Sequence, residues 1–181
     1  METPGSSTSS SAADATRIVL RHFAATLAYR AAKVLRDVPA DFASTSFGVP
    51  TRRPVEIVAH LADLMAWGVS LARGEYTWVA GGSANWEQEV GRFFDELAAL
   101  DRELSNREIT AASMEKLIQG PLADALTHVG QLAMLRGMAG APVRPESYAR
   151  AEIVIGRVGR EQAPPRREFD GDASAPAVST S

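Results

Sequence analysis

Residues 86–104 read WEQEVGRFFDELAALDREL, and their apolar residues follow one helical period. Large apolar side chains recur in alternating steps of four and three residues, which is the spacing of one face of an α-helix. Asn85 stands just before this stretch and Gln88 follows three residues later, a pair typical of a helix start. The stretch therefore predicts a helix that packs through a narrow apolar seam. The seam consists of Trp86, Val90, Phe93, Leu97, Leu100 and Leu104.

Three further amphipathic helices are predicted, over residues 14–37, 54–73 and 121–139. Proline suits the first turn of a helix, and glycine suits the residue just after its end. Pro54 and Gly74 mark the two ends of the second of these helices, and Pro121 and Gly140 those of the third. Shorter helical pieces are expected at residues 113–118 and 145–155. Runs with a period of two residues are missing from the sequence, so no sheet is expected. The prediction is an all-α fold, a four-helix bundle joined by loops.

Composition and length set the domain organisation and exclude several classes of protein. The chain has 181 residues, of which 45% are hydrophobic and 23% charged, which fits one globular domain. Residues 1–13 are rich in serine and threonine and are expected to be disordered. The domain is placed at residues 14–160, with a C-terminal extension that is irregular and ends in a flexible tail over residues 161–181.

Net charge, hydropathy and cysteine content restrict the kinds of partner and the kinds of site that this chain can have. The net charge is −3, which argues against a nucleic-acid partner. No uninterrupted apolar stretch is long enough for a membrane helix, so no membrane partner is expected. The chain has no cysteine, which excludes disulfides and thiolate metal sites. A cytoplasmic location is the expectation.

The histidines are the first candidates for chemistry. His22 lies away from the apolar stripe of its predicted helix and is expected at the surface. His60 lies within the apolar stripe of the 54–73 helix, where a histidine can be a hydrogen-bonded structural group. Asp63 lies three residues further on and could orient the His60 ring.

His128 has Asp124 four residues before it, so both side chains project from one helical face. One interpretation is an Asp–His pair on a solvated face. The other is a metal site, because bundles build such sites from a pair on one helix and a ligand from another. His60 is then the third ligand, and two imidazoles and one carboxylate leave further positions for water or substrate.

Two segments at these residues resemble a known family. Residues 60–67, HLADLMAW, and residues 124–132, DALTHVGQL, are similar to the second-helix and fourth-helix motifs of the DinB-like (DinB/YfiT) metal-binding four-helix bundle superfamily. The resemblance covers about residues 14–140. It implies a divalent metal, most often zinc or nickel, held by three histidines. His60 and His128 match two of them, and Asp124 stands at the third position.

The resemblance also implies an activity. Family members include transferases that use low-molecular-weight thiols such as mycothiol or bacillithiol. Without cysteine in the chain, such a thiol must be a cosubstrate. The function expected is a divalent-metal-dependent enzyme acting on small molecules, by thiol transfer or metal-assisted hydrolysis. Asp124 lowers the charge of the site, makes bound water less acidic and also suits manganese or iron(II).

Other residues and functions stay open at this point. Trp67 and Gln131 are candidates for the pocket beside the ligands, together with Asp63. The cations of Arg52, Arg53 and Arg136 could recognise an anionic cosubstrate or could be solvated charges. The alternatives to an enzyme are a non-catalytic metal-binding or stress-related protein, and a helical homodimerisation module with a vestigial site that pairs through the exposed remainder of the 86–104 seam.

Overall fold

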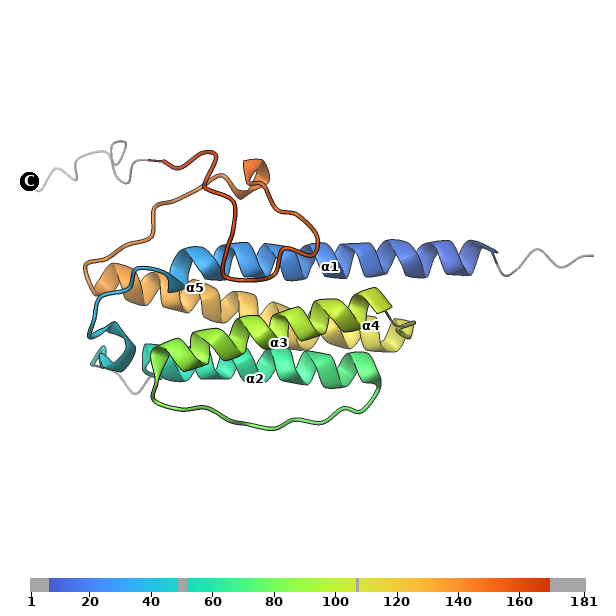
Figure 1. Ribbon diagram of the computed structural model, residues 1–181, viewed down its shortest axis with the longest axis horizontal. Helices are drawn as coiled ribbons and strands as arrows, with labels where there is room; N and C mark the ends of the chain where they lie inside the picture. Colours follow the sequence, from blue (N-terminus) through green and yellow to red (C-terminus); the bar gives the residue numbers. More distant parts are fainter. Residues whose placement is uncertain (1–6, 49–51, 107, 170–181) are drawn as a thin grey trace, which may run out of the picture.

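The computed structural model describes residues 7–48, 52–106 and 108–169, with side chains from residue 13 onward. Four long helices lie side by side: α1 (Ser7–Leu35), α2 (Pro54–Arg73), α3 (Trp86–Asn106) and α5 (Ala123–Met138) (Figure 1). A short helix, α4 (Ala111–Leu117), and a wide helical turn, η2 (Ile118–Leu122), lead into α5. The described residues contain no strand, so the all-α prediction is confirmed for them.

Helices α2 and α3 run in the same direction, while α1 and α5 run the opposite way (Figure 1). A loop that joins two neighbouring parallel helices must run back along the whole length of the first helix. The loop of residues 74–85 does this, as a long extended segment beside α2 (Figure 1). This crossover loop therefore brings its own side chains to the outer surface of α2.

The apolar seam of α3 is buried against other helices of the same chain. Val90 is 4% exposed, and Phe93, Leu97, Leu100 and Leu104 are fully buried. Helix α3 packs mainly against α2, which explains the burial. A dimer is still a prediction of the sequence, but this seam does not remain free to form one.

Helix α2 has the predicted bounds. Pro54 occupies its first turn, and Gly74 ends it with a φ of 79° in the left-handed region that glycine tolerates. By length and composition, α2 is the described helix that could cross a membrane. However, 78% of its apolar window is buried inside the bundle, as in the core helix of a packed domain.

The other helix ends differ from the prediction in part. Helix α1 already begins at Ser7, before the expected start at Asp14. The disorder predicted for residues 1–13 therefore does not fit residues 7–13. Residues 1–6 and 170–181 lie outside the described residues. The pieces predicted at 113–118 and 121–139 appear as α4 and α5. The helix predicted at 145–155 was wrong, because only one 3₁₀ turn, η3 (Tyr148–Arg150), forms there.

Long-range contacts explain why residues 145–155 do not form an α-helix. The chain around Glu146 pairs with the chain around Glu168 in an antiparallel bridge. Glu146 also lies buried against α1, where its carboxylate accepts from the Tyr29 hydroxyl and the Lys33 ammonium, each at 2.7 Å. Lys33 is also 2.7 Å from the Glu168 carboxylate. These ties fasten the C-terminal extension, including residues of the predicted flexible tail, along α1.

Candidate metal centre

The three predicted ligands come together on facing helices. His60 projects from α2, and Asp124 and His128 project from one face of α5. His60 Nε2 lies 3.5 Å from Asp124 Oδ2, and His128 Nε2 lies 3.4 Å from Asp124 Oδ1. One donor atom from each residue can be chosen so that all three lie within 4.8 Å of one another. This group could hold a metal ion.

The donor geometry can be compared with that of a bound ion. A tetrahedral ion with bonds of about 2.0–2.1 Å has its donor atoms about 3.3–3.4 Å apart. The distances of 3.4 and 3.5 Å from the two histidines to Asp124 are close to this value, but they end on different oxygens of the carboxylate; with one atom taken from each residue, all three lie within 4.8 Å of one another. Two imidazoles and one carboxylate are also a donor set that first-row divalent ions accept. The residues present therefore fit a divalent metal.

A hydrogen bond outside the ligand group orients His128. Its Nδ1 lies 2.7 Å from Gln131 Oε1, and an amide oxygen can only accept. In this arrangement Nδ1 donates to Gln131, and Nε2 is the nitrogen that faces Asp124. Metal-bound histidines commonly have such an outer partner on the other ring nitrogen. Gln131 therefore contacts one of the three candidate ligands.

The surroundings of His60 keep its imidazole neutral. Partial burial lowers its pKa, the positive charge of Arg52 and the neighbouring His128 lower it further, and Asp124 acts in the opposite direction. A neutral imidazole is the form that binds a metal. Asp124 is 45% exposed at its side chain, so the group opens to solvent on the α5 side.

An aromatic ring from outside the helices lies beside His60. The Trp78 ring lies edge-on to both His60 and Trp67, with ring centroids 5.8 Å apart in each pair. Trp78 comes from the crossover loop and is 45% exposed. Trp78 was not predicted from the sequence as a site residue. A tryptophan in a loop has no helical periodicity, and only the return of the loop along α2 brings it to this place.

The kink before α5 accommodates Trp67. Gly120 has φ −98° and ψ −106°, outside the helical region. A Cβ at this glycine would lie 2.8 Å from the Trp67 ring, closer than such atoms can approach. The indole therefore packs directly on the backbone of Gly120. Trp67 thus packs in a position that glycine makes possible, and it reaches His60 only through the Trp78 ring.

The prediction that Asp63 orients His60 was wrong. The Asp63 carboxylate instead accepts the backbone N–H of Gly81 at 3.1 Å and the Arg92 guanidinium at 2.7 Å. Arg92 also donates to Glu89 and to the carbonyl of Ala59, each at 2.8 Å. This network fastens the crossover loop to α2 and α3. Asp63 therefore supports the centre through the loop that carries Trp78.

The three arginines occupy different places. Arg136 is 8% exposed and donates to the carbonyls of Val34, Arg36 and Asp37 at the end of α1, so its predicted alternative role in anion recognition was wrong. Arg53 stands at the start of α2, where its backbone N–H donates to Glu56. Arg52 is exposed and close enough to His60 to affect its pKa. His22 is exposed, as predicted.

Comparison with known proteins does not supply a family. The chain matches no protein-family model, no characterised protein and no solved structure. The resemblance to the DinB-like superfamily therefore rests on residues 60–67 and 124–132. What the centre does must be argued from its own geometry.

Replacing Gln131 by alanine is expected to weaken metal binding by about 10- to 100-fold, because the bond that fixes the His128 tautomer is lost. Competition with a chromophoric zinc chelator measures the change. Met134→Ala is the matched control, since Met134 is an exposed residue on the same helix and 61% of it is accessible. Equal zinc affinity in Gln131→Ala and the wild type would exclude this role for the amide.

Proposed function

We propose that this protein is a divalent-metal-dependent enzyme that acts on small molecules, with the ion held by His60, Asp124 and His128. One observation carries the proposal: two separate helices present three donor atoms within 4.8 Å of one another. A three-residue set leaves coordination positions for a substrate, as catalytic metal sites do. The exposed side chain of Asp124 puts these positions within reach of solvent.

The chemistry that suits the centre is thiol transfer, and metal-assisted hydrolysis is the variant with water in place of the thiol. A bound divalent ion supplies Lewis acidity, which lowers the pKa of a thiol or water. The chain has no cysteine, so the thiol is a cosubstrate, as the DinB-like resemblance implies for mycothiol or bacillithiol. In the transfer, sulfur bonds to the acceptor carbon, the leaving group departs with its electron pair, and the thiol proton passes to solvent.

The residues of the chain divide the remaining tasks. Gln131 holds His128 in the tautomer that presents Nε2. Trp67 and Trp78 give the His60 side an apolar wall on which a planar or apolar acceptor can pack. Zinc or nickel is the ion favoured by two imidazoles, and the Asp124 oxygen also admits manganese or iron(II).

The proposal is tested on protein purified without a histidine tag, by measuring its metal content with elemental analysis and its rate of thiol consumption. We expect about one ion per chain, and thiol consumption with an electrophilic acceptor only in metal-loaded protein. Asp124→Ala is expected to lose both ion and turnover, while Asp124→His restores a ligand and keeps the ion. Metal-loaded protein that consumes none of mycothiol, bacillithiol or glutathione and hydrolyses no ester would contradict the enzyme and leave a non-catalytic metal-binding protein.

A further inference from the structure

Helix α2 and the turn η2 fit into each other next to the candidate metal centre. The edge of the Trp67 ring lies on Gly120, so close that a Cβ at this glycine would be 2.8 Å from Cη2 and 2.9 Å from Cζ3. One residue further along each segment the fit is reversed. Pro121 packs over Gly68, with its Cγ 3.6 Å from the place of a Cβ. Each segment thus offers a glycine to a ring of the other, and we call this pair of contacts the interlock.

The interlock lies close to the ligands along both segments. Gly120 is four residues before Asp124, and Trp67 is seven residues after His60, which is about 10 Å along a helix. Because α2 and α5 run in opposite directions (Figure 1), a residue beyond His60 on α2 faces a residue before Asp124. The interlock therefore fixes α2 against the start of α5 within about two helical turns of the centre.

The distances within the centre depend on helix packing to different degrees. Asp124 and His128 share α5, so their separation follows from that helix alone. His60 stands on α2, and the 3.5 Å between its Nε2 and Asp124 Oδ2 depends on how the two helices are held. Metal–ligand distances must be met to within about 0.2 Å. The approach of His60 to Asp124 is therefore the distance that the interlock can set.

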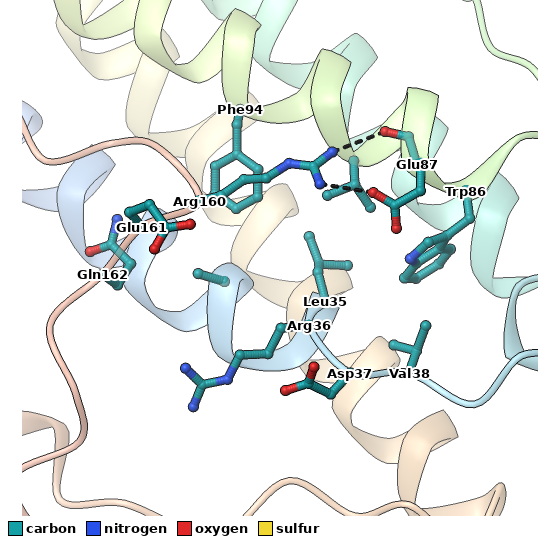
Figure 2. Close-up of a pocket in the computed structure, with 12 residues that line it drawn as sticks. Leu35, Arg36, Asp37, Val38, Trp86, Glu87, Phe94, Arg160, Glu161 and Gln162 are labelled. Carbon is teal, nitrogen blue, oxygen red and sulfur yellow. Dashed lines mark hydrogen bonds and ion pairs between the residues drawn. The ribbon is translucent and has the colours of Figure 1, made fainter.

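The bundle leaves free space in another place, away from this contact. A cavity of about 460 Å³ lies between the end of α1, the first half of α3 and the C-terminal extension, with Trp86 and Phe94 in its wall (Figure 2). None of the described residues that line it belongs to α2, η2 or α5. Gly68 and Pro121 are instead buried. Close-packed contacts transmit a displacement rather than absorb it, so a change at the interlock reaches the ligands.

Trp67 also connects the interlock to His60. Its ring lies edge-on to Trp78, whose ring lies edge-on to His60, with 5.8 Å between the centroids in both pairs. A displaced Trp67 must therefore move either η2, which leads to Asp124, or Trp78, which lies beside His60. Both movements change the centre.

We propose that Trp67 and Gly120 are positioning residues, whose contact sets the approach of His60 to Asp124 and thereby the affinity and geometry of the bound ion. Neither residue is a ligand, and both act through the helices that carry the ligands. The inference rests on the metal centre of the proposed function and is independent of the substrate.

The test uses Co²⁺ as the probe, because its visible absorption reports the number and arrangement of its ligands. Gly120→Ala places a methyl group against the Trp67 ring, and we expect Co²⁺ affinity to fall by about 10- to 100-fold, as for other residues that hold a ligand in place. The spectrum at saturating Co²⁺ should change as well. Gly130→Ala on α5 is the matched control, since no described atom outside its own helix lies within 4 Å of a Cβ there. It should keep the affinity and spectrum of the wild type.

A second substitution separates positioning from loss of stability. Trp67→Phe withdraws the ring edge and makes room for the new methyl group, so Gly120→Ala/Trp67→Phe should bind Co²⁺ more tightly than Gly120→Ala alone. A merely structural contact would lower the Tm and leave the spectrum of the folded protein unchanged. Trp67→Phe keeps the backbone of η2 as it is, and it is the variant to measure if Gly120→Ala does not fold. We expect Trp67→Phe by itself to change the Co²⁺ spectrum.

Failure of this inference differs from failure of the proposed function. Wild-type protein that binds no Co²⁺ would contradict the metal centre and the inference together. If the wild type binds Co²⁺ and the folded variants at Trp67 and Gly120 keep its affinity and spectrum, the centre stands and the positioning role is overturned. The role is also overturned if the double variant binds Co²⁺ no more tightly than Gly120→Ala.

Discussion

Replacing His128 by alanine is expected to abolish metal binding, from about one ion per chain to none detected. His60 and Asp124 would remain as two donors 3.5 Å apart, too few for a stable site in competition with water. The loss is also visible as stability. An ion at 1,000 times its Kd stabilises the native state by about 4 kcal/mol. For a chain of this size that is a Tm rise of about 8–16 °C on adding metal, and the variant should show none.

The matched control for this experiment is His22→Ala. It removes the same residue type from an exposed position on α1. Its metal content and its Tm rise with zinc should equal those of the wild type. Elemental analysis and thermal melts in the absence and presence of zinc give both readouts. If His128→Ala kept a full equivalent of metal with the same Tm rise, the centre would not be where the three side chains meet.

Replacing Lys33 by methionine is expected to destabilise the fold by about 3–5 kcal/mol. The Glu146 side chain is fully buried and that of Lys33 is 5% exposed. Their salt bridge spans 2.7 Å. Without the ammonium, the Glu146 carboxylate keeps the Tyr29 hydroxyl as its side-chain partner and remains a buried charge without a counter-ion. Urea denaturation followed by far-UV circular dichroism measures the free energy of unfolding.

Two further variants serve as controls for Lys33→Met. The double variant Lys33→Met/Glu146→Gln removes both charges of this pair and should recover much of the loss, because the one carboxylate that still loses Lys33, that of Glu168, is 26% exposed at its side chain. Arg17→Met breaks the exposed pair with Asp14, which is 2.8 Å long, and should cost less than about 1 kcal/mol. If Lys33→Met cost no more than Arg17→Met, the buried pair would not hold the extension on α1.

The sequence predicted the helices whose signals are local. The bounds of α2 follow from Pro54 and Gly74, which act on their own neighbours. The seam of α3 follows from periodicity within one helix. Residues 145–155 were mispredicted as a helix because Glu146 is held by Tyr29 and Lys33, more than a hundred residues away. Such a contact leaves no mark on local spacing.

The same distinction holds at the candidate centre. The proximity of Asp124 and His128 follows from their spacing on one helix, and His60 was selected because it interrupts an apolar stripe. Asp63 was assigned to His60 by spacing alone, but Arg92, on another helix, takes its carboxylate. Trp78 was missed because its place depends on the path of a loop. The spacing of side chains within one helix was thus predictable, while contacts made between helices or through the crossover loop were not.

The crossover loop is fastened by backbone hydrogen bonds at two places, with residues 78–80 between them. On one side, the Thr77 N–H donates to Ser70 Oγ at 2.6 Å. On the other, the Gly81 N–H donates to Asp63 and the Ser83 N–H donates to Glu89. Residues 78–80 between them are exposed. A randomised library over these three codons could therefore vary the surface beside His60, including Trp78, while the anchors, the bundle and the three candidate ligands stay as they are.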